Sequence, residues 1–427
     1  MQKLPEDVDS VTCLQISLNS KEIKMTNQFT SFAWTSTFKS RSAKLTLASV
    51  FAALLLFGCG GIDAPRIITF GDSTLDEGVE GYKPTIQGSA PTGPSSSRLF
   101  SDVVATALGS NELCAFFRSA NLRASYTTVP GCTSFAAQGG RINPVGLEVI
   151  YGVGASATSA EPIQTQMVSA AAALGNYSNT DIVLISVSGN DLRDLVNAFS
   201  AMAAGKPTQF LTLTTGVLGA ATVNGLLAAD PATAPLKIGA AYMTALATKL
   251  QTMVKTNILE KGATKVVILN APKVTALPSL ALGLKSLEAQ AGTTARAQFE
   301  GAITFWMQAY NQQLTSQYMD ENRVMVFNSY SLYEEIFAQP SNFGFTNVKD
   351  SACPPIGQDS EGLVYSLPTC TEAVANAYIA SGPTGYISGT KLSGNVSGFF
   401  FSDYHPTPKA HKIVGERIVN AIAGKGW

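Results

Sequence analysis

Short apolar runs alternate along this chain with longer stretches in which apolar residues recur at helical spacing. Four runs rich in Val, Ile and Leu predict β-strands, at residues 66–70, 181–187, 265–269 and 323–327. Strands this apolar are usually buried on both faces, as in parallel sheets.

Helical periodicity fills most of the chain between and after these runs. The predicted helices cover residues 98–108, 162–174, 237–261, 293–317 and 408–423. Alternation of strands and helices predicts the α/β fold class, with helices packed on a mainly parallel sheet. Two segments do not follow this alternation. Residues 196–236, rich in Ala, Gly, Thr and Leu, predict helical excursions or a lid, and residues 338–398, rich in Gly, Pro, Ser and Asn, predict long loops.

The N-terminal region has the residue pattern of an export signal. Residues 45–58 carry no charge and follow three basic residues, and a run of this length is too short to span a bilayer comfortably. This layout is typical of a secretory signal peptide. The four residues ending at Cys59 also resemble a bacterial lipobox. We therefore expect residues 1–58 to be an N-terminal extension and signal peptide and Cys59 to be lipidated.

An exported protein of this kind would lie in the periplasm or at the cell surface, held by its lipid anchor, or would otherwise be secreted. Residues 25–44 contain no acidic residue, whereas acidic residues lie upstream. Because signal peptides have a positively charged first region, we expect translation to begin at Met25.

Four cysteines follow Cys59: Cys114, Cys132, Cys353 and Cys370. An even number suits disulfide bonds in an oxidising compartment, and the absence of C-x-x-C spacing argues against a metal or redox motif. Three pairings are possible, and the two locally closed pairs, 114 with 132 and 353 with 370, are favoured.

Charge and histidine content exclude several classes of function. The chain has 29 Lys and Arg against 30 Asp and Glu, a formal net charge of −1, so there is no electrostatic reason to expect a nucleic-acid partner. The only two histidines stand six positions apart. They cannot form a three-His zinc site or an H-E-x-x-H motif, and we expect neither a metal site nor a cofactor.

A candidate nucleophile follows the first predicted strand, in the tripeptide Gly71-Asp72-Ser73. A serine at the carboxyl end of a parallel strand points into the crevice where such sheets bind ligands. A serine nucleophile needs a base. His405 precedes a proline on the loop before the last helix, and Asp403 can orient its imidazole, whereas His411 lies inside that helix and is interpreted as a packing or capping residue.

Six blocks, taken in order, resemble the GDSL lipase/acylhydrolase family, also called SGNH hydrolases. They are Phe70 to Ser73 with Asp76 and Gly78, Phe135 to Gly140, Ser186 to Asp191, Asn270 to Pro272, Phe343 to Asn347, and His405 to Thr407. The resemblance covers the chain from about Ile67 to Ile422. It implies a three-layer αβα sandwich around a flavodoxin-like sheet. Because motifs at both ends belong to one site, we expect a single domain at 62–427 with insertions near 196–236 and 338–398.

The resemblance also implies roles for individual residues. Ser73 would be the nucleophile of a serine esterase or lipase that forms an acyl-enzyme, and His405 would be its base. The backbone N–H groups of Ser73 and Gly139 and the side-chain amide of Asn190 would form the oxyanion hole, with Gly140 as the rival to Gly139. The expected partner is a small-molecule or lipid ester.

The chain departs from the family pattern at two positions. Ser188 stands where the third block usually has glycine. The family's acid lies three residues before the histidine, a place that Ser402 occupies here. We expect Asp403 to act as the orienting acid; alternatively, a backbone carbonyl near Ser402 holds the imidazole and Asp403 is merely solvated.

The same site would also serve other functions. An acyltransferase would use a second alcohol in place of water, and carbohydrates or phospholipids are alternative substrates. A third alternative, supported by the displaced Asp403, is a non-catalytic surface lipoprotein that keeps the fold.

Overall fold

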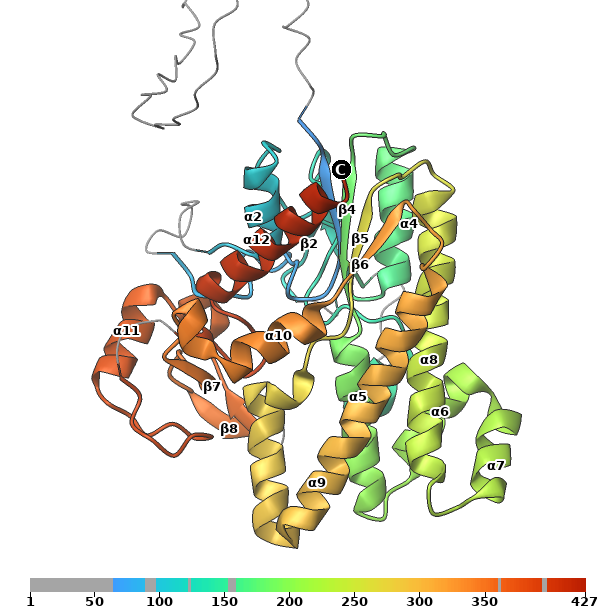
Figure 1. Ribbon diagram of the computed structural model, residues 1–427, viewed down its shortest axis with the longest axis vertical. Coiled ribbons are helices and arrows are strands. Elements are labelled where there is room, and N and C mark those ends of the chain that lie inside the picture. Colours follow the sequence, from blue (N-terminus) through green and yellow to red (C-terminus); the bar gives the residue numbers. More distant parts are fainter. Residues whose placement is uncertain (1–63, 89–96, 122–123, 153–158, 360–361, 394–397) are drawn as a thin grey trace, which may run out of the picture. The chain divides into compact units, whose positions relative to one another are not determined.

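The computed structural model describes residues 64–427 except 89–96, 122–123, 153–158, 360–361 and 394–397 (Figure 1). The predicted signal peptide and Cys59 lie outside the described residues. Asp63–Trp427 form one compact unit.

The central sheet is built from the four apolar runs that predict strands. These are β1 (Ile67–Gly71), β4 (Ile182–Ser186), β5 (Val266–Leu269) and β6 (Val324–Phe327), which pair in parallel in the order β1-β4-β5-β6. Their bounds differ from the predicted ones by no more than one residue at either end. The predicted α/β class with a mainly parallel sheet is confirmed.

A further extended segment, residues 133–137, runs along the outer edge of β1. The N–H of Thr69 donates to the carbonyl of Thr133 at 3.1 Å, and the N–H of Phe135 donates to the carbonyl of Thr69 at 2.8 Å. The bridge between Thr69 and Ser134 is parallel. With this segment the order becomes 2-1-3-4-5, which is the flavodoxin-like order.

Helices cover both faces of the sheet. Successive residues of a strand point to opposite faces, and because these strands are apolar throughout, both faces must be buried. Ile68 and Val183 belong to one apolar cluster with α4 (Ile163–Leu174), α8 (Ala234–Val254) and the second half of α9 (Pro278–Gln317). Ile67, Leu184 and Val267 belong to the other cluster, with α2 (Phe100–Ala107), α10 (Ser329–Ala338) and α12 (Pro408–Gly424). Figure 1 shows the two helical layers on either side of the sheet. The predicted three-layer sandwich is confirmed.

Helices also fill the first predicted insertion. The end of α5 (Gly189–Ala203), α6 (Thr208–Leu218) and α7 (Ala220–Ala229) lie there, and α8 continues into a π-helical turn, Lys255–Leu259. The long helix α9 bends sharply at Gly292, which has a φ of 85° (Figure 1). Only its second arm, residues 293–317, is predicted from the sequence.

The second insertion is more regular than the long loops predicted for residues 338–398, so that prediction is wrong for this part of the chain. Its elements are a 3₁₀ turn (Pro340–Phe343), β7 (Asn347–Ser351), the hairpin of β8 (Gly357–Asp359) and β9 (Gly362–Val364), a second 3₁₀ turn (Leu367–Thr369), α11 (Glu372–Ala380) and β10 (Gly398–Phe400), which pairs with β7. This segment forms regular elements because it packs around a third apolar cluster, which includes Ala352, Cys353 and Phe401.

Two disulfide bonds join Cys114 to Cys132 and Cys353 to Cys370, the pairs favoured from the sequence. The first closes the chain around a small hairpin of β2 (Phe117–Arg118) and β3 (Thr127–Thr128); the short helix α3 (Val145–Tyr151) follows further along. None of the helices in the described part of the chain combines the length and apolar content needed to cross a bilayer.

Candidate active site

Ser73 lies in a tight turn at the carboxyl end of β1. The carboxylate of Asp72 accepts hydrogen bonds from the backbone N–H and the hydroxyl of Thr74, at 3.0 and 2.8 Å, and the N–H of Asp72 donates to the carbonyl of Ser186 at 3.0 Å. These bonds fix Ser73 between β1 and β4, where the strand order reverses and open α/β sheets bind their ligands. Burial raises the pKa of Asp72 to about 6.

Two glycines allow the backbones around Ser73 to approach closely. A Cβ on Gly71, whose φ is 146°, would lie 1.9 Å from the carbonyl oxygen of Ser186, and one on Gly140 would lie 2.2 Å from the carbonyl oxygen of Gly71. Gln166 holds Gly71 from the other side, because its amide accepts from the N–H at 2.8 Å and donates to the carbonyl at 2.9 Å. No larger residue fits at either glycine.

The segment that contains Gly139 is fixed against this turn. The carboxylate of Asp76 accepts from the N–H of Gln138 at 2.8 Å, and the side-chain amide of Asn190 donates to the carbonyl of Gly140 at 3.2 Å. Gly139 has a φ of 75°, a conformation that favours glycine. Ser73, Gly139 and Asn190, the three residues expected in the oxyanion hole, all line one groove.

Helix α5 holds the same segment through two buried carboxylates. Asp191 accepts from the N–H groups of Ile142 and Asn143 at 3.0 and 2.7 Å. Asp194 accepts from Nε and Nη2 of Arg141 at 2.7 and 3.2 Å, while Nη1 of Arg141 donates to the carbonyl of Gly139 at 2.5 Å. The sequence prediction missed this contact because the fold alone brings Arg141 and Asp194 together.

Ser188 occupies a backbone conformation that side chains rarely adopt. Its φ is 112°, the only positive φ at a non-glycine residue in the described ranges. It connects β4 to α5 and is completely buried. The departure from the family's glycine at this position therefore costs conformational strain.

His405 lies on the turn between β10 and α12. The N–H of Phe401 donates to the carbonyl of His405 at 3.0 Å, and Thr407 caps the first turn of α12 with its hydroxyl, which accepts from the N–H of Ala410 at 3.3 Å. Burial, together with the positive charge of Arg193, lowers the pKa of His405 to about 4. The imidazole is therefore neutral at neutral pH, as a general base requires.

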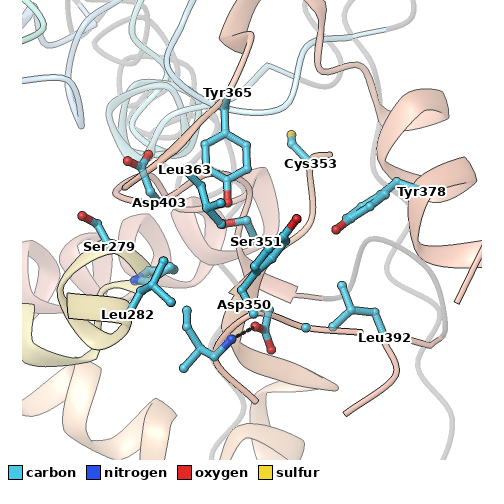
Figure 2. Close-up of a pocket in the computed structure, with 14 residues that line it drawn as sticks. Ser279, Leu282, Asp350, Ser351, Cys353, Leu363, Tyr365, Tyr378, Leu392 and Asp403 are labelled. Carbon is cyan, nitrogen blue, oxygen red and sulfur yellow. Dashed lines mark hydrogen bonds between the residues drawn. The ribbon is translucent and has the colours of Figure 1, made fainter. Parts of the chain in front are cut away.

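The structure separates Asp403 from the groove. Among the described residues, the hydrogen bond at Nδ1 of His405 goes to the hydroxyl of Ser402, at 2.9 Å, and not to Asp403 or to a backbone carbonyl. Asp403 instead lines a small cavity together with Ser279 and Tyr365 (Figure 2). Burial raises the pKa of Asp403 to about 6, and the charge of Arg193 opposes this shift.

The second histidine takes a structural position. His411 lies inside α12 and is buried, and its Nδ1 accepts from the N–H of Phe100, the first residue of α2, at 3.3 Å. This contact agrees with its interpretation as a capping histidine.

Ser73, Gly139, Asn190 and His405 come from four distant segments and line the same groove, whose volume is about 1260 Å³. In addition to these four residues, side chains of α5 and of the first arm of α9, the part before Gly292, form the walls of the groove. Throughout the part of the chain that the structure describes, no group of three or more His, Cys, Asp or Glu side chains is arranged to hold a metal ion.

Comparison with known proteins agrees with this geometry. No curated protein matches the chain. The family model for GDSL-like Lipase/Acylhydrolase, a family of ester hydrolases, matches residues 67–418, a range that includes every residue of the groove described above. The chain therefore belongs to the GDSL-like lipase/acylhydrolase family.

Proposed function

We propose that this protein is a serine esterase or lipase that hydrolyses carboxylic esters through an acyl-enzyme on Ser73. The observation that carries the proposal is the meeting of Ser73, Gly139, Asn190 and His405 at one groove. His405 would take the proton of Ser73 as the hydroxyl attacks the ester carbonyl, and would return it to the leaving alcohol. Water, activated by the same imidazole, would then release the acid.

The oxyanion of the tetrahedral intermediate would be bound by the N–H groups of Ser73 and Gly139 and by the amide of Asn190. The bond from Asn190 to the Gly140 carbonyl uses one of its two amide hydrogens, so the second remains for the substrate. Loss of one oxyanion-hole donor typically costs about 2.7–4 kcal/mol of transition-state stabilisation.

The wall of the groove on α9 supports an apolar acyl group as part of the substrate. Leu280, Leu284 and Leu287 line the groove from the first arm of α9. Their spacing of four and three residues places them on one helical face, over a length of about 10 Å. We propose that the acyl chain lies along this face, with Ser73 at its carbonyl end.

The proposal is tested with a chromogenic butyrate or octanoate ester and with a fluorophosphonate that labels activated serines. Wild-type protein is expected to turn over the ester and to be labelled at Ser73, and Ser73→Ala is expected to do neither. Equal turnover by both proteins, or labelling elsewhere, would refute the assignment.

We also propose that the protein is exported and anchored by a lipid on Cys59. The apolar run at 45–58 supports export, and the two disulfide bonds fit an oxidising compartment. Metabolic labelling with a fatty acid is expected to mark wild-type protein but not Cys59→Ser. Labelling of both would show that Cys59 is not the site.

A further inference from the structure

The first arm of α9, residues 278–291, packs loosely against the rest of the chain. Its buried residues are Pro278 and Leu284, whereas the other six buried residues of α9 lie on the second arm. Lys285 adds an exposed contact, in which its Nζ donates to the carbonyl of Tyr386 at 3.0 Å. An element with few buried apolar contacts opens at low cost, so the hydrogen bonds at the start of this arm matter for its position.

Two hydrogen bonds join the start of this arm to the turn that carries His405. The hydroxyls of Ser279 and Tyr404 lie 2.6 Å apart, and the N–H of Ser279 donates to the carbonyl of Asp403 at 3.2 Å. This N–H belongs to the first turn of α9, where backbone N–H groups have no acceptor within the helix. Because His405 directly follows Tyr404, the arm is bonded to the segment that holds the proposed base.

Tyr404 also contacts α5, on the opposite wall of the groove. The guanidinium of Arg193 lies 4.4 Å from the centre of the Tyr404 ring, and the ring centres of Tyr404 and His405 lie 6.5 Å apart. All three residues line the groove, as does Ser279. The phenol of Tyr404 therefore contacts both walls of the groove, next to the imidazole.

We propose that Tyr404 is a positioning residue that couples the first arm of α9 to His405, so that a long acyl chain raises kcat as well as affinity. The inference rests on the proposed function and on the proposed place of the acyl chain along the leucines of this arm. A chain bound there fixes the arm, and the bond between the hydroxyls of Ser279 and Tyr404 then fixes the turn that holds the imidazole. Because the imidazole serves in both acylation and deacylation, binding energy far from the ester carbonyl raises the rate of the chemical steps.

The dependence of kcat on acyl-chain length tests this coupling. For wild type, kcat for an octanoate ester is expected to exceed kcat for the butyrate ester of the same alcohol by about tenfold. Tyr404→Phe keeps the ring over Arg193 but loses the hydroxyl, and is expected to bring this ratio to about one by lowering kcat for octanoate alone. Ser279→Ala is expected to do the same, and the double variant to show almost no further loss, because both changes remove one hydrogen bond.

Three results would overturn the proposal. They are a wild-type kcat that does not rise with chain length, a ratio in Tyr404→Phe that stays at the wild-type value, and an equal loss of kcat for both esters, which a merely structural contact would produce. The ratio of the two kcat values does not depend on the fraction of folded protein, because unfolded molecules lower both rates equally. Loss of fold therefore cannot imitate the expected result.

Thr248 on α8 supplies the matched control. Its hydroxyl accepts from the side-chain amide of Gln317, on the second arm of α9, at 2.9 Å, and it does not line the groove. Thr248→Val is expected to keep the wild-type ratio, and a ratio near one in this variant would overturn the role of the first arm. Labelling of wild-type Ser73 by a fluorophosphonate separates the two proposals: an unlabelled wild type refutes the esterase itself, whereas a labelled wild type with an unchanged ratio in Tyr404→Phe refutes only the coupling.

Discussion

At the scale of single residues, the groups around His405 are expected to titrate in two ranges. His405 has a pKa lowered to about 4, mainly by burial, and Asp403 has a pKa raised to about 6, also mainly by burial. As pH falls, Asp403 therefore loses its charge first, and His405 becomes protonated at lower pH. We expect kcat/KM to fall partly below pH 6 and completely only near pH 4.

The variant Asp403→Asn separates the two steps. Asp72 and Asp191 also have pKa values raised to about 6 by burial, so the part of the upper step that disappears in this variant belongs to Asp403. The pH dependence of kcat/KM for wild type and variant measures it. A single step near pH 6.5, the ordinary value for histidine, would contradict the environment described for His405.

The strain at Ser188 predicts a stabilising substitution. A left-handed φ costs a non-glycine residue about 1–2 kcal/mol, whereas glycine adopts it freely and loses part of that advantage through its greater entropy when unfolded. Ser188→Gly is expected to raise the free energy of unfolding by about 1 kcal/mol. Ser200→Gly, inside the regular part of α5, is expected to lower it by about 0.5 kcal/mol. Urea titration of both variants measures the two changes, and a loss of stability in Ser188→Gly would show that the position is unstrained.

At the scale of secondary-structure elements, α5 and the segment around Gly139 act as one unit through Arg141. Its guanidinium donates hydrogen bonds both to the carboxylate of Asp194 and to the carbonyl of Gly139. The ammonium group of a lysine cannot reproduce this planar, forked arrangement of donors. Arg141→Lys is expected to lower kcat by up to about a hundredfold with little change in KM, because a displacement of about 1 Å in a catalytic group has this effect.

Arg66 supplies the matched control for Arg141. Its guanidinium forms a similar fork with Asp181, at 3.1 and 2.6 Å. The two residues immediately precede β1 and β4, so this ion pair lies at the amino ends of the strands, away from Ser73 at the carboxyl ends. Arg66→Lys is expected to leave kcat unchanged. Equal losses of kcat in the two variants would indicate a general loss of stability. An unchanged kcat in Arg141→Lys would show that Arg141 does not position the catalytic groups.

The first arm of α9 predicts a change in acyl-chain preference. Gly283 lines the groove beside Leu284, and a Cβ at this position meets no heavy atom within 4 Å. Gly283→Phe is therefore expected to fill the groove without distorting the helix. We expect kcat/KM for laurate esters to fall by about tenfold and that for butyrate esters to stay nearly unchanged, because a blocked apolar contact costs about 1–3 kcal/mol.

Gly301 provides the control on the second arm of α9. It is exposed, has no heavy atom within 4 Å of an added Cβ, and does not line the groove. Gly301→Phe should leave the ratio of laurate to butyrate hydrolysis unchanged. If Gly283→Phe reduced both rates equally, the acyl chain would not lie along this arm.

At the scale of the whole molecule, the parts that could be predicted from the sequence are those with a local cause. The four central strands are apolar because both of their faces are buried, so composition alone indicates them. Ser73, Gly139, Asn190 and His405 stand in short motifs whose order could be read directly. Their shared groove depends on the sheet order, which parallel strands alone do not determine and which the resemblance of the six blocks implies.

The features missed from the sequence arise from contacts between distant segments. Arg141 and Asp194 lie 53 positions apart and carry no motif. The elements in the second insertion are stabilised by the Cys353–Cys370 bond and by packing on Phe401, and not by strong local periodicity. The sequence predicts Asp403 as the orienting partner of His405 because a carboxylate usually has this role, whereas in the structure the closed turn brings the hydroxyl of Ser402 to Nδ1.

The two disulfide bonds support different halves of the active site. Cys353 donates its N–H to the carbonyl of Phe401 at 3.0 Å, next to the turn that carries His405, whereas the carbonyl of Cys114 accepts from the N–H of Ser134 at 3.2 Å, in the segment that leads to Gly139. The bonds close loops of similar length, with separations of 17 and 18 residues. Replacing either pair with alanine is therefore expected to cost a similar free energy of unfolding, about 3 kcal/mol.

The local consequences of the two replacements are expected to differ. Loss of Cys353–Cys370 should speed amide hydrogen exchange at 398–407 and leave 137–143 protected, and loss of Cys114–Cys132 should do the reverse, because local opening follows the contacts that are removed. Each double-alanine variant is the control for the other, and hydrogen-exchange mass spectrometry with kcat measured on the same samples provides the readout. Faster exchange in both segments of both variants would mean that the two halves of the site open together, so that the sheet does not isolate them from one another.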